Sequence, residues 1–158
     1  MRRKLAELIR ERRIETVARD DAQVAKLLEQ SAAHLASSRM IGHTDPEGAF
    51  SLAYDSIRKQ LTAILLDHGF RAKSAGSHAA TGQAVSILLK GFDVEGFEWL
   101  RLVRNATEYG SDKRPSATLA DLEEAWEFAA ELNELRAKHQ PATSSASHTT
   151  TATADGSA

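Results

Sequence analysis

Apolar residues recur at intervals of three and four along most of this chain, and this spacing limits the fold more than any other feature. The clearest run lies between Pro46 and Gly69 and consists of Phe50, Tyr54, Ile57, Leu61, Ile64 and Leu65. Such spacing places the apolar side chains on one face of an α-helix. No stretch between turn residues shows the alternation of apolar and polar residues that is typical of a half-buried strand. The sequence therefore predicts an all-α protein, with an up-and-down bundle of about five helices as the simplest packing.

Residues that start and stop helices mark the other elements. Thr44-Asp45-Pro46-Glu47 supplies a capping residue, a first-turn proline and an acidic first turn for the helix that ends at Gly69. Thr118 with Asp121 resembles a capping box at the start of the last long helix. The remaining predicted helices cover residues 1–19, 21–42, 77–91 and 95–109, and the second of these could continue the first. Residues 70–76 are expected to form a basic loop bounded by glycines.

Composition divides the chain into three parts. Residues 1–19 hold seven Lys/Arg against three Glu, and this charged N-terminal helix is typical of a solvated arm, with a nucleic-acid contact as the alternative. Residues 20–140 are expected to form the bundle. Residues 141–158 are almost entirely Ser, Thr and Ala, which lack the apolar bulk that offsets the entropy of ordering. A disordered C-terminal tail is therefore expected.

Residue types exclude several classes of function. The chain contains no cysteine, so disulfides, thiolate zinc sites, iron–sulfur clusters and cysteine nucleophiles are ruled out. The charged N-terminal segment offers no uninterrupted apolar stretch of the length that secretion or a membrane span requires. We therefore expect a cytoplasmic protein without a metal or cofactor. The formal net charge of −2 implies that any contact with phosphates is local.

The predicted helix over residues 95–109 carries the residues with the most distinctive chemistry. At 100° per residue, Arg101, Arg104 and Glu108 share a narrow sector, and Asn105 and Tyr109 flank it. The opposite side is expected to hold Trp99, Leu102, Val103 and Ala106. Trp99 and Trp126 lie on apolar stripes and are expected in the core rather than as stacking platforms.

Two arginines on one turn of a helix repel each other unless carboxylates or phosphates lie between them. Glu108, four residues beyond Arg104, can form an intrahelical ion pair with it. Arg101 then needs another partner. Either it pairs with an acidic side chain of a neighbouring helix, such as Asp55, or it is available for a ligand.

The string Arg101-Leu102-Val103-Arg104-Asn105-Ala106-Thr107-Glu108-Tyr109 resembles the signature of the HEPN superfamily of small helical-bundle proteins. The resemblance covers roughly residues 20–140. Three further segments support it: the stretch from Ala53 to Arg58, which includes Tyr54 and Asp55, the helix exit Gly69-Phe70-Arg71, and Gly76-Ser77-His78 before the next helix. The order of these parts matches better than any one motif.

The resemblance implies a bundle that usually dimerises, with the arginine motif of each protomer facing the groove between them. Many HEPN proteins are metal-independent ribonucleases, often toxins paired with a nucleotidyltransferase, and others only bind. In the ribonuclease members, a histidine several residues after the arginine transfers protons at the RNA 2′-hydroxyl. Here Arg104 and Asn105 match the motif, whereas Tyr109 stands in place of the histidine. Because an unperturbed tyrosine has a pKa near ~10, it is a poor base at neutral pH.

His78 is the histidine that the resemblance brings nearest to the motif, at the start of the preceding helix. It could substitute for the absent motif histidine, although a locally bonded histidine at a helix start is the commoner arrangement. The candidate catalytic residues are therefore Arg104, Asn105, Tyr109 and His78, with Glu108, Tyr54 and Asp55 in support.

Three functions follow as expectations. The leading one is a binding component of a bacterial toxin–antitoxin or defence pair, in which Arg101, Arg104 and Asn105 hold a phosphate, an RNA segment or the acidic surface of a nucleotidyltransferase partner. The second is an active endoribonuclease that uses His78. The third is an assembly module that docks through its basic first helix. A homodimer is the expected oligomer.

Overall fold

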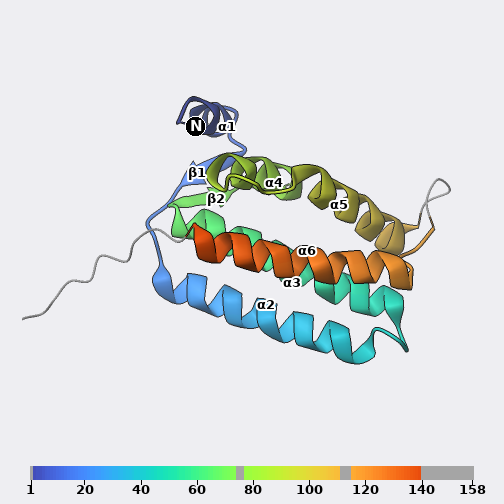
Figure 1. Ribbon diagram of the computed structural model, residues 1–158. Coiled ribbons are helices and arrows are strands. Elements are labelled where there is room, and N and C mark those ends of the chain that lie inside the picture. The colour runs from blue at the N-terminus through green and yellow to red at the C-terminus, as the bar shows by residue number, and fades with distance from the viewer. Residues whose placement is uncertain (1, 74–76, 111–114, 140–158) are drawn as a thin grey trace, which may run out of the picture.

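The computed structural model describes residues 2–73, 77–110 and 115–139, and these residues form a helical bundle with one small sheet (Figure 1). The predicted all-α class is therefore confirmed. The described part holds six helices, where about five were expected. In chain order the elements are α1 (Arg2–Arg10), β1 (Ile14–Thr16), α2 (Asp21–Ile41), α3 (Pro46–Asp67), β2 (Phe70–Ala72), α4 (Ser77–Leu88), α5 (Val94–Tyr109) and α6 (Leu119–Lys138).

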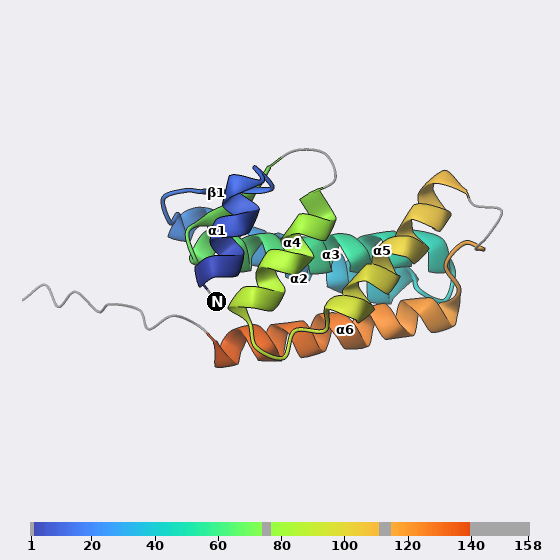
Figure 2. The ribbon, with the colours of Figure 1, turned by 90° about the horizontal axis from the view of Figure 1, so that it is seen from above.

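Helix α3 lies at the centre of the bundle. It pairs with α2 along most of its length and also packs against α6, while α4 and α5 cross its other side (Figures 1 and 2). Most of its apolar stripe is fully enclosed, with Phe50, Ile57 and Leu61 all 0% exposed. The elements that later form the candidate site, α3, α4 and α5, therefore share one continuous core.

Small polar residues allow close approach between α2 and its neighbours. Ser38 donates to the carbonyl of Ala49 at 2.7 Å, and its hydroxyl accepts the Trp126 indole N–H at 2.8 Å. Ser31 similarly bonds Ser56 across the α2–α3 interface. Because every one of these buried hydroxyls has a partner, their burial does not leave an unsatisfied polar group.

The predicted helix starts are confirmed by their side-chain caps. The carboxylates of Asp20 and Asp45 accept the backbone N–H three residues ahead, at the starts of α2 and α3. Asp93 does the same for α5. Thr118 and Asp121 form the complete capping box at the start of α6. Since Asp20 caps α2, this helix is a separate element and not a continuation of the first.

The N-terminal segment differs from the single helix expected over residues 1–19. Helix α1 ends at Arg10, and Arg12 adopts a φ of +57°, a left-handed conformation that no helix continues through. The chain then extends as β1 and pairs antiparallel with β2, with Ile14 opposite Ala72 and Thr16 opposite Phe70. The expected basic loop at 70–76 therefore begins as a strand. Both strands have three residues, too short for an alternating pattern to be recognised in the sequence.

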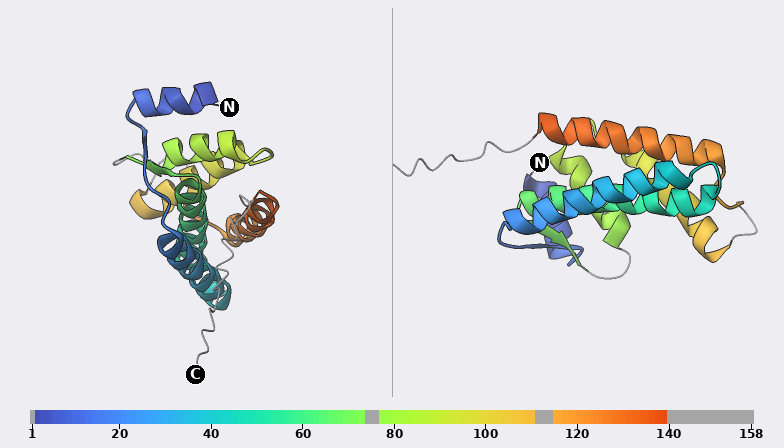
Figure 3. Two further views of the ribbon diagram at one scale, coloured as in Figure 1. Left: turned by 90° about the vertical axis from the view of Figure 1, so that its left-hand side faces the viewer. Right: turned by 90° about the horizontal axis from the view of Figure 1, so that it is seen from below.

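Helix α1 is not a solvated arm, because its narrow apolar stripe is covered. Leu5 and Leu8 are 7% and 6% exposed, and α1 packs against α4 on the outside of the bundle (Figure 3). The predicted tail of residues 141–158 lies outside the described residues. Among the helices that the structure describes, none has the length and apolar character needed to cross a membrane.

Candidate functional site

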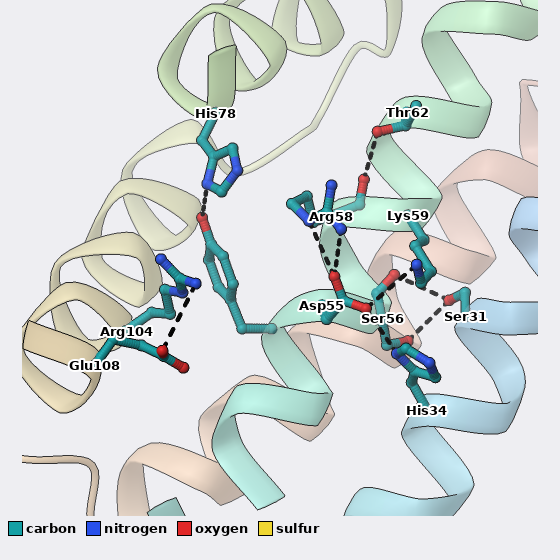
Figure 4. Close-up of polar contacts among 11 residues, drawn as sticks. Ser31, His34, Asp55, Ser56, Arg58, Lys59, Thr62, His78, Arg104 and Glu108 are labelled. Atoms are coloured by element: carbon teal, nitrogen blue, oxygen red, sulfur yellow. Dashed lines mark hydrogen bonds and ion pairs between the residues drawn. The ribbon is translucent and has the colours of Figure 1, made fainter. Parts of the chain in front are cut away.

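The candidate site is a pocket of about 290 Å³ between α3, the first turn of α4 and the last turns of α5. Its wall combines side chains from all three helices (Figure 4). The lining residues are Ser51, Leu52, Tyr54, Asp55, Arg58, His78, Arg104 and Glu108. Five of the predicted site residues are thus brought together: Tyr54, Asp55, His78, Arg104 and Glu108.

Two aromatic groups from different helices meet at the centre of the pocket. The Tyr54 hydroxyl on α3 and Nδ1 of His78 on α4 lie 2.9 Å apart and share a hydrogen bond (Figure 4). His78 therefore bonds across the bundle to a side chain of α3. The Tyr54 ring is held from behind, because it stacks on Phe97 with 6.0 Å between centroids and 6° between planes. His78 and Arg104 both line this pocket.

Burial and nearby cations set the protonation of this pair. Burial raises the pKa of Tyr54 to about 12, so the phenol stays neutral and can donate a hydrogen bond. Burial, followed by the positive charges of Arg58 and Arg104, lowers the pKa of His78 below its usual 6.5. At neutral pH the pocket therefore presents a neutral imidazole among arginines, and such an imidazole is able to accept or relay a proton.

Arg104 is only weakly neutralised within the protein. Its guanidinium lies 4.0 Å from the Glu108 carboxylate, at the limit of an ion pair, and Glu108 also accepts a 3.0 Å hydrogen bond from Ser51. The same guanidinium lies over the rings of Tyr54 and Tyr109, at 5.9 and 5.7 Å from their centroids. These aromatic contacts orient the cation, and its N–H groups donate no hydrogen bond to any residue that the structure describes.

Arg101 differs from Arg104, although both lie on the same face of α5. Its Nε and a terminal nitrogen both contact Glu98 at 2.8 Å, so this arginine already has a charge-assisted partner. Of the two alternatives for Arg101, the structure shows an ion pair, but its partner is a carboxylate one turn earlier on its own helix and not Asp55 of a neighbouring helix. Asn105 is half-buried and does not line the pocket.

Asp55 lies among three basic side chains, two on its own helix and one on α2. Arg58 donates to it from Nε at 3.0 Å, and Nζ of Lys59 lies at 3.3 Å. His34 of α2 brings Nδ1 to 2.7 Å without hydrogen-bond geometry. Burial by itself would raise the pKa of Asp55, but the hydrogen bonds and charges of Arg58 and Lys59 together lower it. This carboxylate therefore stays ionised and fixes Arg58 at the edge of the pocket.

Sequence reasoning missed three lining residues, Ser51, Leu52 and Arg58. Arg58 and Ser51 were detectable, because they lie four residues after and three residues before Tyr54 on one helix and so share its face. Two other expectations need correction or refinement. Leu102, expected on the apolar side of α5, is 48% exposed. Trp99 and Trp126 pack against the core from partly buried positions.

The described residues contain no group of three or more metal-ligating side chains that could hold an ion. Comparison of the chain with known protein families, with curated proteins and with solved structures found no significant match in any of the three.

Proposed function

We propose that this protein is a HEPN-like binding component of a bacterial toxin–antitoxin or defence module, and that it holds an RNA phosphate at Arg104. The observation that supports this best is the guanidinium of Arg104, which lines a pocket and whose nearest carboxylate in the described ranges, that of Glu108, lies 4.0 Å away. Guanidinium groups bind phosphate oxygens through paired N–H donors, so an incompletely used arginine in a pocket suits such a ligand. Within this proposal a second copy or a nucleotidyltransferase is the protein partner.

The surroundings of Arg104 favour an anion that arrives from outside. Arg58 borders the same pocket, and the charges of Arg58, Arg104 and Arg101 all disfavour a proton on His78. A phosphate would place a negative charge among these cations and replace the distant Glu108 as the partner of Arg104. The hydroxyl of Tyr54 and the imidazole of His78 add neutral hydrogen-bonding groups beside it.

Replacing Glu108 with glutamine is expected to tighten binding of a ten-nucleotide uridine RNA about fivefold. Glu108 lies 4.0 Å from the Arg104 guanidinium, so a phosphate bound there comes close to its carboxylate, and two like charges about 4 Å apart in water repel by about 1 kcal/mol. Glutamine removes that charge while keeping an acceptor for Ser51. Fluorescence polarisation at fixed salt measures the change. Glu131→Gln, which removes an exposed carboxylate from α6, is the matched control and should change affinity little. Unchanged or weaker binding by Glu108→Gln would contradict the proposal.

A second function, a metal-independent endoribonuclease, is favoured by the contact between His78 and Tyr54. When Nδ1–H of His78 donates to the Tyr54 oxygen, Nε2 becomes a base that could take a proton from an RNA 2′-hydroxyl. The lowered pKa keeps this base unprotonated at neutral pH. The pocket then supplies a base and a phosphate-binding arginine without the histidine that Tyr109 replaces.

Cleavage of RNA by the purified protein in the presence of a chelator tests this second function. His78→Gln is expected to lower the rate by a factor of roughly 10² to 10⁴, the usual contribution of a general acid or base. His43→Gln, at an exposed histidine outside the pocket, is the matched control and should leave the rate unchanged. If the unmodified protein does not cleave RNA, the endoribonuclease function is rejected and only the binding function remains. If the unmodified protein and His78→Gln cleave at equal rates, His78 is not the base.

A further inference from the structure

The small sheet joins two basic segments that are far apart in the sequence. Strand β1 and the turn before it lie beside β2, and the Lys73 backbone N–H donates to the Arg13 carbonyl at 2.9 Å. Residues 10–16 and 69–73 together hold five cationic side chains against two carboxylates. We call the four cations nearest the strands, Arg12, Arg13, Arg71 and Lys73, the basic ribbon.

The carboxylates at this end of the molecule do not neutralise the basic ribbon. Glu15 is shared between Arg71, whose Nε lies at 2.8 Å, and Lys73, whose Nζ lies at 3.3 Å. Arg13 approaches Glu11 only to 3.8 Å. Arg12 is exposed, and no ion pair joins it to any residue in the described ranges. An exposed, incompletely paired cluster of this kind attracts phosphates locally although the whole chain is slightly acidic.

The basic ribbon and the Arg104 pocket lie along the same side of the molecule. In Figure 2 the strand region, the first turn of α4 and the last turns of α5 follow one another along one edge. His78, in the pocket wall, comes five residues after Lys73. Five residues of fully extended chain span at most about 17 Å, which limits the distance between the backbone of Lys73, at one end of the ribbon, and that of His78 in the pocket wall. An RNA strand that is stacked with the roughly 3.4 Å axial spacing of helical nucleic acid covers that distance in about five nucleotides.

We infer that the ligand of the Arg104 pocket is a single-stranded RNA segment longer than about five nucleotides, whose flanking phosphates lie on the basic ribbon. This inference rests on the proposed function and specifies its ligand. The exposed ring of Tyr109, 76% accessible and beside Arg104, offers a face on which a base can stack, as in other single-strand sites. A free nucleotide would contact the pocket and leave the ribbon unused.

The test compares uridine RNAs of four and ten nucleotides across a range of salt concentrations. One triple variant combines Arg12→Gly, Arg13→Gln and Lys73→Gln. It keeps the pair between Arg71 and Glu15, and glycine suits the positive φ at residue 12. The control triple variant, Lys26→Gln, Arg39→Gln and Lys138→Gln, removes the same charge from exposed positions on α2 and α6.

The expected result is a loss confined to the longer RNA. For the decamer, the ribbon variant should bind at least tenfold more weakly at low salt, and the slope of log Kd against log salt should fall by about two, since each phosphate contact contributes about 0.7. The affinity of the ribbon variant for the tetramer, and the affinity of the control variant for either RNA, should change little. Equal losses in both triple variants, or undiminished binding of the decamer by the ribbon variant, would overturn the inference. The proposed function fails separately, if Arg104→Ala binds both RNAs as the unmodified protein does.

Discussion

Replacing Arg104 with alanine should weaken RNA binding by about ten- to a hundredfold while leaving the fold intact. A hydrogen bond to a charged group contributes about 1.5–3 kcal/mol, and every 1.4 kcal/mol is a factor of ten in Kd. The folded protein should lose little stability, because the only ion pair of Arg104 within the described residues is the 4.0 Å contact with Glu108. Fluorescence polarisation with the ten-nucleotide RNA gives the affinity, and thermal unfolding shows that the variant is folded.

Two other arginines supply the comparison for Arg104→Ala. Arg101→Ala should weaken binding less, because Glu98 already occupies that guanidinium at 2.8 Å. Arg39→Ala removes an exposed arginine of α2 outside the pocket and should have almost no effect. Equal losses in all three variants would show that binding follows net charge alone. If Arg101→Ala lost more affinity than Arg104→Ala, the phosphate would bind at Arg101 and the proposed assignment to Arg104 would be wrong.

Replacing Phe97 with alanine should lower the free energy of unfolding by about 3–5 kcal/mol. The ring is 0% exposed and contacts Tyr54, Phe92 and Phe128, with centroids 6.0–6.4 Å away. It also fits against Gly82, where an added Cβ would lie 2.7 Å from Phe97 Cδ1. The cavity left by alanine therefore has walls on several helices that cannot all collapse into it. Chemical denaturation followed by circular dichroism measures the loss.

The Phe97 variants also connect the core to the pocket, since this ring supports Tyr54 from behind. Phe97→Leu keeps most of the side-chain volume and should lower the free energy of unfolding clearly less than Phe97→Ala does. Leu102→Ala, at a 48% exposed position on the same helix, should change stability by less than about 1 kcal/mol. If Phe97→Ala were as stable as Leu102→Ala, the packing described between α3, α4 and α5 would be incorrect.

The helices were predictable because their signals are local. Caps such as Asp45 with Pro46, and Thr118 with Asp121, state where a helix begins within four residues of sequence. The strands were not predictable for the opposite reason. Ile14 is 1% exposed because it pairs with Ala72, 58 residues away along the chain, and nothing in either short segment specifies that pairing.

The candidate site was predictable only in part in its members, and less so in its contacts. Helical periodicity places Arg101 and Arg104 on one face, and the structure agrees. Periodicity says nothing about which neighbouring helix faces them, so the contact of His78 with Tyr54 and the weak pairing of Arg104 required the packed structure. The ion-pair partner of Arg101 is a nearby residue of its own helix, since Glu98 lies only three residues away and takes the place that a carboxylate of another helix could have had.

Chemical-shift changes on adding the ten-nucleotide uridine RNA to the ¹⁵N-labelled protein would locate the ligand directly. We predict that the largest changes fall on Ser51, Tyr54, Arg58, His78 and the Arg104 side chain, which line the pocket. Smaller changes should follow along the basic ribbon. Changes confined to the opposite groove of α5 and α6, around Glu124 and Glu127, or no change at all, would contradict phosphate binding at Arg104.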